Sequence, residues 1–198
     1  MIKASSQEQL VKKIEIEEIH PGHETKGYIR FISQADNKLW DVIPIILINM
    51  PPGKTQYIER ENTLCMRLAN RNVTLFSSGK IYVTNTRDLE EAHLILKAIK
   101  KIINEAYRDY LKYGKPNHEE IEMIKNITWK DIYQYLPKVN CRKCGYPICS
   151  TFAVSVLLGE ATLSECELLK EPKYASNLKS LREKFGPILV SCLGWHVI

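Results

Sequence analysis

Residues 140–166 read NCRKCGYPICSTFAVSVLLGEATLSEC and carry four of the six cysteines of this 198-residue chain. Their spacing is Cys141-x2-Cys144-x4-Cys149-x16-Cys166. The first three lie on a short loop that contains glycine and proline. The apolar residues after Cys149 predict a short helix that returns Cys166 to the same place. Because unpaired thiolates repel one another and are costly to bury, the convergence of four cysteines indicates a bound positive centre.

An all-cysteine site suits either a [4Fe–4S] cluster or a structural zinc ion. Zinc sites usually use two compact Cys-x2-Cys pairs, and only Cys141 and Cys144 form such a pair here. A cubane is wider than one ion, so it accepts scattered ligands more readily. Gly145 is expected to leave a backbone N–H free to bond to a sulfide. The spacing therefore favours a [4Fe–4S] cluster, and zinc, a disulfide or a redox Cys-x2-Cys motif are the alternatives.

Residues 129–169 also resemble a known family, on the strength of the stretch from Asp131 to Ala153 together with Cys166. The family is a four-cysteine [4Fe–4S] domain. It occurs in the large (gamma) subunit of the corrinoid iron–sulfur protein of acetyl-CoA decarbonylase/synthase and in the RnfB subunit of the Rnf electron-transport complex. The resemblance implies that Cys141, Cys144, Cys149 and Cys166 are cluster ligands and that the chain transfers single electrons at low potential. A corrinoid-binding barrel is not expected, because the chain is short and has no repeating βα pattern.

The composition describes a folded, mildly basic chain with a formal net charge of +5, long enough for one medium or two small domains. Residues 1–19 are polar and charged, unlike a signal peptide. The longest apolar run, 42–50, contains a proline and is too short to cross a bilayer. We therefore expect a cytoplasmic protein without a membrane span, in a reducing compartment that suits a thiolate cluster.

Residues 24–104 predict an α+β pattern of one strand, one helix, four strands and a second helix. Gly114–Asn117 predicts a linker, so we expect one domain at 1–113 and a mostly helical iron–sulfur domain at 114–198 that ends in a C-terminal helix and an apolar tail. The expected strands are 24–33, 56–59, 63–68, 73–76 and 80–85. Two helices are expected: the first is capped by Asp36 and runs to residue 47, and the second runs from Leu89 to Tyr110 and is capped by Asp88.

The stretch Val73–Thr84, followed by Asp88 and a Glu-Glu-Ala helix start, resembles one half-repeat of the TATA-binding protein fold. The resemblance implies an antiparallel sheet with two helices. In that family two half-repeats form a saddle that bends DNA, so this chain would need a second copy, as a homodimer. Phe76 matches one wedging phenylalanine, but Glu61 and Asn62 stand where the other belongs. Together with the repulsion between Glu59 and phosphate, this argues against nucleic acid as a partner.

The remaining cysteines and histidines are expected to be structural or superficial. Cys65 lies in an apolar strand, so we expect a buried core thiol. Cys192 is expected to be structural, with a role near a partner's metal as the alternative. His20 and His23 predict an exposed turn, and the half of a metal site is the alternative. His93 and His118 are also expected at the surface.

The chain shows no nucleophile–base pair, Gly-rich phosphate loop or paired catalytic carboxylates, so we assign no catalytic residues and no independent enzyme activity. The leading hypothesis is a low-potential electron-transfer or accessory subunit of an anaerobic metalloenzyme complex, in one-carbon metabolism or reductive activation. Lys138, Arg142 and Lys143 would steer an acidic redox partner, unless they are ordinary solvated residues. The alternatives are a protein- or nucleic-acid-binding module with a structural metal, and a cluster maturation factor.

Overall fold

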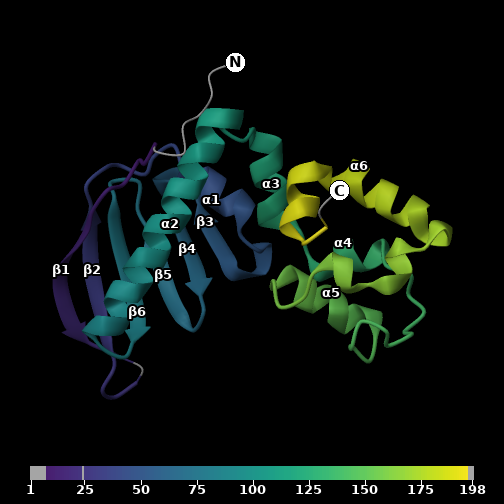
Figure 1. Ribbon diagram of the computed structural model, residues 1–198, viewed down its shortest axis with the longest axis horizontal. Helices are drawn as coiled ribbons and strands as arrows, with labels where there is room; N and C mark the ends of the chain where they lie inside the picture. The colour runs from purple at the N-terminus through teal and green to yellow at the C-terminus, as the bar shows by residue number, and fades with distance from the viewer. Residues whose placement is uncertain (1–7, 24, 196–198) are drawn as a thin grey trace. The chain divides into compact units, whose positions relative to one another are not determined.

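The computed structural model describes residues 8–23 and 25–195. The chain divides into two compact units, each with its own core. The first comprises Met1–Leu47 and Thr55–Pro116, and the second comprises Ile48–Lys54 and Asn117–Ile198. The first unit is α+β and the second is helical, which confirms the predicted α+β class with a mostly helical second part (Figure 1).

The first unit is built on one six-stranded sheet in the order β1-β2-β6-β5-β4-β3, in which every neighbouring pair is antiparallel. Short turns join β4 to β5 and β5 to β6, as predicted from the Asn- and Gly-containing segments. The strands are β1 (Ile14–Pro21), β2 (Ile29–Ala35), β3 (Thr55–Ile58), β4 (Thr63–Leu68), β5 (Arg71–Leu75) and β6 (Lys80–Thr86), and the short 3-10 helices η1 (Pro52–Lys54) and η2 (Glu59–Glu61) flank β3.

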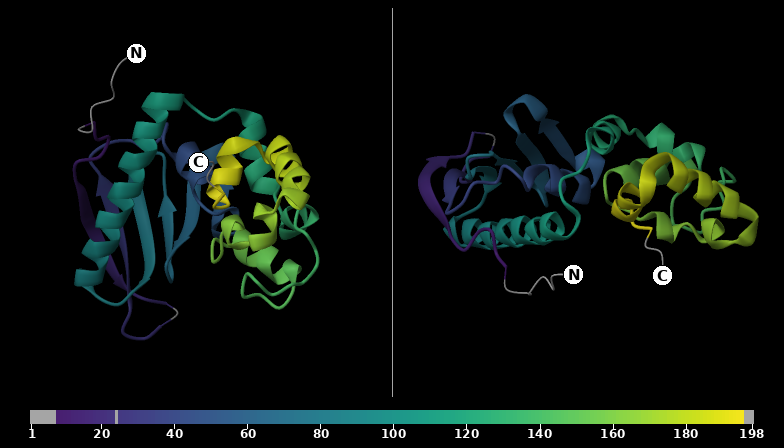
Figure 2. Two further views of the ribbon diagram at one scale, coloured as in Figure 1. Left: turned by 45° about the vertical axis from the view of Figure 1, so that its right-hand side comes forward. Right: turned by 90° about the horizontal axis from the view of Figure 1, so that it is seen from above.

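Helix α2 (Leu89–Tyr113) lies across one face of this sheet, as the two directions of view show (Figures 1 and 2). Asp88 caps it by accepting the Glu91 N–H at 2.8 Å, which confirms the predicted cap. The apolar stripe of the helix is buried, as its spacing predicted. The facing core consists of Ala92, Ile95, Leu96, Ile99 and Ile103 from α2 with Phe31, Leu64, Met66, Val73, Leu75, Ile81 and Val83 from the strands.

Strand β1 is absent from the sequence prediction, and the predicted first strand at 24–33 is displaced, because the observed β2 is Ile29–Ala35. The pairing of β1 with β2 shifts register between Ile16 and Glu18, which is a β-bulge. A bulge interrupts the alternation of apolar and polar residues that marks a strand. β1 is also an edge strand with many charged residues, so its pattern resembled a polar N-terminal segment.

The predicted cap of the first helix is wrong. The Asp36 carboxylate instead accepts the backbone N–H groups of Lys12 and Lys13, at 3.1 and 3.0 Å, and so holds the segment before β1. The helix itself, α1, spans Ile43–Asn49. Pro44 lies in its first turn, where a missing N–H removes no helical hydrogen bond.

The Glu91 carboxylate ties α2 to two arginines. It pairs with Arg71 of β5, and its Oε1 lies 3.0 Å from Nη2 of Arg87. The hydrogen bond from Arg71, followed by that from the Arg87 backbone N–H, lowers the pKa of Glu91 from 4.5 to about 2. The unfolded chain therefore takes up this proton at a higher pH than the folded one.

We expect the ion pairs of Glu91 to make the free energy of unfolding depend on pH in the acidic range. The contribution of Glu91 to the free energy of unfolding should be complete above about pH 5 and fall as the pH drops towards 2, by roughly 1–2 kcal/mol. Urea denaturation at a series of pH values measures it. Glu91→Gln should remove this component of the pH dependence, whereas Glu90→Gln, at the exposed neighbouring position, should keep it. Equal pH dependence in the wild type and E91Q would contradict the assignment.

The second unit contains the helices α3 (His118–Asn126), α4 (Trp129–Gln134), α5 (Cys149–Leu157), η3 (Leu163–Glu165), η4 (Glu167–Lys170), η5 (Pro172–Tyr174) and α6 (Ala175–Cys192). The 3-10 helix η1 and the end of α1 also belong to it, because it includes Ile48–Lys54. Helix α4 packs against α5, and α5 confirms the helix predicted after Cys149. The last residue of the predicted linker at 114–117 belongs to a helix start, because Asn117 caps α3 in a capping box with Glu120. None of the described helices combines the length and the apolar character needed to cross a membrane.

The C-terminal segment folds back within the second unit. Helix α6 is interrupted at Gly186, whose φ of 72° only glycine adopts readily. Beyond it Leu189, Val190 and Leu193 are buried, and the Leu193 carbonyl accepts the Leu163 N–H at 2.9 Å. The described part of the predicted apolar tail therefore packs on the core of the second unit.

Candidate metal centre

All four predicted ligand cysteines line one pocket in the second unit. Cys141 and Cys144 come from the loop between α4 and α5, and Cys149 is the first residue of α5. Cys166 lies between the two 3-10 helices η3 and η4. The expectation that the chain returns Cys166 to the loop is therefore confirmed.

The loop before α5 is curled by residues in the left-handed conformation. Lys138, Asn140, Arg142 and Gly145 have φ values of 61°, 50°, 62° and 85°. Such a conformation is costly for residues other than glycine, so it marks a segment shaped for binding. Successive peptide units in left-handed turns direct N–H groups to one side, where they form a concave site for anions. Thiolates and sulfides are anions of this kind.

Asn140 is a site residue that the sequence interpretation missed. Its Oδ1 accepts the Cys149 N–H at 2.9 Å, which closes the loop onto the start of α5. Asparagine adopts the left-handed conformation more readily than most residues and often bonds to nearby backbone groups. Its place directly before Cys141 was the available signal.

The backbone N–H groups of the loop are largely free. Within residues 138–148, the only N–H that donates to a described backbone group is that of Gly145, which bonds to the Arg142 carbonyl at 3.0 Å. The prediction that the Gly145 N–H is free is therefore wrong, and the residue is needed instead for its positive φ. The neighbouring N–H groups remain available as donors to sulfur.

Cys166 is the most enclosed of the four, at 7% exposure. Burial raises the pKa of the Cys166 thiol, and the nearby thiols of Cys144 and Cys149 raise that pKa further. The backbone N–H groups of Leu169 and Leu168 act in the opposite direction. The thiols of Cys144 and Cys149 are thus close enough to Cys166 to disfavour its thiolate, and a bound cation would offset this effect.

The separation of the sulfur atoms can be compared with the spacing of a single-ion site. No three of these four sulfur atoms come within 4.8 Å of one another. Four thiolates at about 2.3 Å from a single zinc ion would be only about 3.8 Å apart. The thiols in this arrangement therefore do not have the spacing of a single tetrahedral zinc site. The free space among the lining side chains is about 10 Å³.

Three aromatic residues of the second unit, Trp129, Tyr133 and Tyr146, differ in whether they line the pocket. Tyr146 lines the pocket and packs edge-on against Phe152, with ring centroids 5.5 Å apart. Trp129 and Tyr133 are not among the residues of the pocket; their rings pack against each other at 6.2 Å. Of these three aromatic residues, Tyr146 is therefore the one placed to keep water from the sulfur atoms.

The three predicted basic residues are all exposed on the loop. Arg142 lines the pocket. Lys143 lies 4.0 Å from a carboxylate oxygen of Glu171, and the Lys138 ammonium lies 5.3 Å from the centre of the Tyr133 ring. Lys138, Arg142 and Lys143 thus place positive charge on the loop, and the exposed carboxylate of Glu167 also lines the pocket.

The other two cysteines lie apart from this pocket. Cys65 is half-buried on the sheet face opposite α2, with its sulfur 3.6 Å from the Thr74 hydroxyl, so the prediction of a buried core thiol is wrong. The apolar strand has two faces, and Cys65 belongs to the open one. Cys192 donates to the Met50 carbonyl at 3.2 Å, and burial raises its pKa to about 11, as suits a structural thiol.

His23, His93 and His118 are exposed, as predicted, whereas His20 is half-buried and belongs to strand β1 rather than to a turn. The Glu18 carboxylate lies 3.0 Å from Nε2 of His20.

Comparison with known proteins identifies the segment that holds the four cysteines. A family model described as "Putative Fe-S cluster" matches residues 136–167. This segment is an iron–sulfur cluster domain. The match begins just after α4 and ends just after Cys166, so it contains all four thiols of the pocket.

Several curated proteins are similar to the chain over this region. The acetyl-CoA decarbonylase/synthase complex subunit gamma of Methanocaldococcus jannaschii is 48% identical over 65 residues, which are 33% of this chain and 13% of that subunit. The corrinoid/iron-sulfur protein large subunit of Moorella thermoacetica is 40% identical over 45 residues, or 23% of this chain and 10% of that protein. An uncharacterized protein of M. jannaschii is 34% identical over 59 residues, or 30% of this chain and 26% of that protein.

These matches confirm the predicted resemblance for the iron–sulfur domain. The chain spans only about an eighth of the length of the first of these relatives. No solved structure matches the chain, so the likeness of the first unit to a TATA-binding protein half-repeat stays a prediction.

Proposed function

We propose that the chain binds one [4Fe–4S] cluster through Cys141, Cys144, Cys149 and Cys166 and serves as a low-potential electron-transfer subunit. The observation that carries this proposal is the meeting of four thiols in one pocket, within a segment that matches an iron–sulfur cluster family. A [4Fe–4S] cluster supplies reversible one-electron chemistry.

The chain's own residues divide the site into a closed side and an open side. Cys166 is buried beneath Phe152 and Leu168, which keep water from that side. Cys141 is exposed on the loop, next to Arg142. The free N–H groups of the loop and the nearby positive charge both stabilise the more negative, reduced form. The open side is where a redox partner approaches.

The setting proposed for this activity is an anaerobic complex of one-carbon metabolism. Support comes from the relatives, which are named as subunits of acetyl-CoA decarbonylase/synthase complexes and as a corrinoid/iron-sulfur large subunit. In this proposal the cluster unit is the redox module of an accessory subunit. The first unit, proposed to be like a half-repeat of the TATA-binding protein, is the scaffold that docks to the rest of the complex.

Purification without oxygen tests the proposal. We expect about four iron and four sulfide per chain, and an EPR signal of a reduced [4Fe–4S] cluster after addition of dithionite. Stoichiometric zinc with no iron would overturn it and would leave a binding module with a structural metal. A cluster that no reductant reduces would overturn the electron-transfer function alone.

The basic residues of the loop predict a salt-dependent rate. In the double variant Arg142→Glu and Lys143→Glu, we expect electron transfer with an acidic ferredoxin to slow by about tenfold at ~20 mM salt and by less than about twofold at ~0.5 M salt. Stopped-flow absorbance measures the rate. The double variant Lys179→Glu and Lys184→Glu on α6 makes the same charge change away from the pocket and should have a small effect. A rate that Arg142→Glu and Lys143→Glu leave unchanged at every salt concentration would exclude steering.

Cluster delivery to another protein is the second candidate function. The observation in its favour is that Cys141 is exposed on a loop with a single bond between backbone groups, so an acceptor thiol could reach this ligand. Mixing the loaded protein with an apo-ferredoxin distinguishes the two functions. Cluster loss to the acceptor without net electron transfer supports delivery, whereas reduction of a loaded acceptor with the cluster retained supports the electron carrier.

A further inference from the structure

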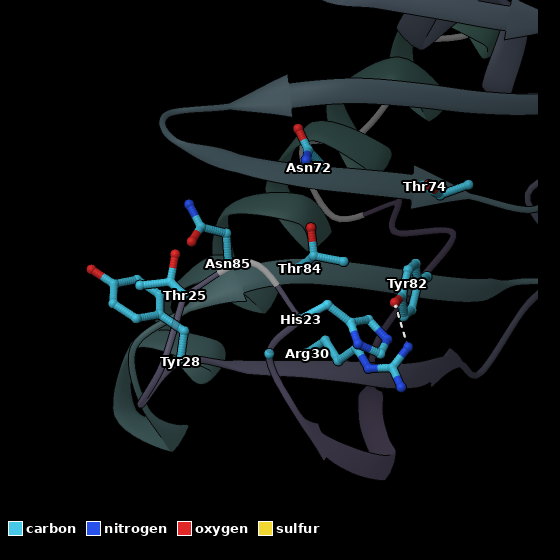
Figure 3. A pocket seen from close by; sticks show the side chains of 10 residues that line it. His23, Thr25, Tyr28, Arg30, Asn72, Thr74, Tyr82, Thr84 and Asn85 are labelled. Atoms are coloured by element: carbon cyan, nitrogen blue, oxygen red, sulfur yellow. Dashed lines mark hydrogen bonds between the residues drawn. The ribbon is translucent and has the colours of Figure 1, made fainter.

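The first unit has a pocket on the sheet face opposite α2, which the proposed function does not use. Its volume is about 340 Å³, and its lining residues are drawn in Figure 3. Asn72 and Thr74 of β5 alternate with buried residues and are paired with Thr84 and Tyr82 of β6. Since alternate side chains of a strand point to opposite faces, these four project from the open face into the pocket.

Arg30 of β2 brings an unsatisfied positive charge to this pocket. Its Nη1 donates to the Tyr82 hydroxyl at 3.3 Å, a long bond to a neutral group, drawn dashed in Figure 3. Its Nε is buried and has no hydrogen-bond partner among the described residues. No described carboxylate lines the pocket or forms an ion pair with Arg30.

Arg30 is half-buried, its Nε has no partner and no described carboxylate compensates its charge, so its other N–H groups would stabilise a bound anion. Arginine binds oxyanions through a planar fork of N–H groups, and phosphate oxygens match this fork well. Thr74 and Thr84 place further hydroxyl donors in the same pocket. This end of the pocket therefore suits a phosphate group.

The remainder of the pocket suits an uncharged planar group. Tyr28 and Asn85 lie at the opposite end from the bond between Arg30 and Tyr82 in Figure 3. A tyrosine ring provides a face for stacking, and an asparagine amide both donates to and accepts from the edge of a base. The volume is at the lower end of the range of small-molecule sites, so it admits one nucleotide rather than a larger cofactor.

We propose that this pocket binds a phosphate monoester of mononucleotide size, with its phosphate at Arg30 and its base or sugar against Tyr28. The site lies wholly in the first unit and does not depend on the cluster or its ligands. It makes the first unit a small-ligand domain rather than a docking scaffold alone.

Isothermal titration calorimetry on the full, cluster-loaded chain tests the proposal. The probes are AMP, GMP, CMP and UMP, their nucleosides, ribose 5-phosphate and inorganic phosphate. We expect at least one monophosphate to bind with Kd below about 1 mM and at least tenfold more tightly than its nucleoside. Arg30→Gln should weaken that binding by at least about tenfold, and Thr84→Val, which keeps the shape and loses one hydroxyl, by about threefold to tenfold.

Arg67→Gln is the matched control, because Arg67 is exposed, pairs with Asn72 across β4 and β5, and does not line the pocket. It should change the Kd by less than about twofold. Unchanged iron content and far-UV circular dichroism confirm that each variant is folded.

Three results would overturn the proposal. The first is that neither the monophosphates nor inorganic phosphate bind below about 1 mM. The second is equal affinity for nucleoside and monophosphate, which would show that the phosphate group makes no favourable contact with Arg30. The third is that a single-stranded oligonucleotide binds more tightly than any monophosphate and is weakened equally by Arg30→Gln and Arg67→Gln. That result would make the whole face a nucleic-acid surface.

Discussion

Replacing Cys166 with alanine should lower the amount of complete cluster per chain by at least about tenfold, because the iron that this thiolate would hold loses its protein ligand and is readily released. Cys166 is the most buried of the four proposed ligands, and no other cysteine lines the pocket. The variant removes one sulfur atom and adds no bulk. Iron and sulfide analysis of anaerobically purified protein, together with EPR after reduction, measures the effect.

Cys65→Ala is the control for this experiment. Cys65 is a half-buried thiol in the other compact unit, and its loss should leave iron and the EPR signal at the wild-type level. Cys141→Ala is the second test, because Cys141 is exposed and its removal opens no cavity in the core. It should also lose the complete cluster. Wild-type iron, sulfide and EPR in both Cys166→Ala and Cys141→Ala would refute the assigned ligand set.

Phe152→Ala should destabilise the folded chain by about 3–5 kcal/mol, which is a large part of the stability of a typical domain. The Phe152 side chain is 1% exposed, lines the cluster pocket and packs against Tyr146. Its removal leaves a cavity that the neighbouring residues of the second unit can fill only in part. It also admits water to the side of the pocket where Cys166 lies, so we expect faster cluster loss in air.

Urea denaturation followed by circular dichroism and by the visible absorbance of the cluster measures both effects of Phe152→Ala. Val154→Ala is the matched control, because it also shortens an apolar side chain of α5, but one that is 36% exposed. It should cost less than about 1 kcal/mol. A cost for Phe152→Ala as small as that of Val154→Ala would show that Phe152 is not part of the core that supports the site.

The parts of this molecule that depend on local chemistry were predictable. The cysteine spacing and the apolar helix after Cys149 were enough to predict that Cys166 joins the loop, and the pocket confirms it. The stripe on α2 and its Asp88 cap were also correct, because helix periodicity and capping involve residues within one or two turns of each other. Whether the four thiols hold a [4Fe–4S] cluster stays a prediction.

The wrong prediction for the Gly145 N–H reflects a local turn to Arg142, whereas the other errors come from pairing between distant segments. β1 was missed because a bulge breaks its alternation, and the pairing with β2 that makes it a strand is not a local property. Asp36 could cap a helix, but its carboxylate instead accepts the backbone N–H groups of the distant residues Lys12 and Lys13. Cys65 was assigned to the core because the sequence shows that a strand is apolar but not which face is covered by a helix.

The sequence alone therefore determined that this protein has an α+β part, a helical part and one set of four cysteines suited to a metal centre, since spacing and periodicity are written in neighbouring residues. Only the tertiary structure decided how Asn140 closes the loop, how far apart the sulfur atoms lie and that Arg30 faces a pocket without a counter-charge. These features join residues from separate strands, helices and loops, and their geometry depends on strand register and packing, which no short stretch of sequence encodes.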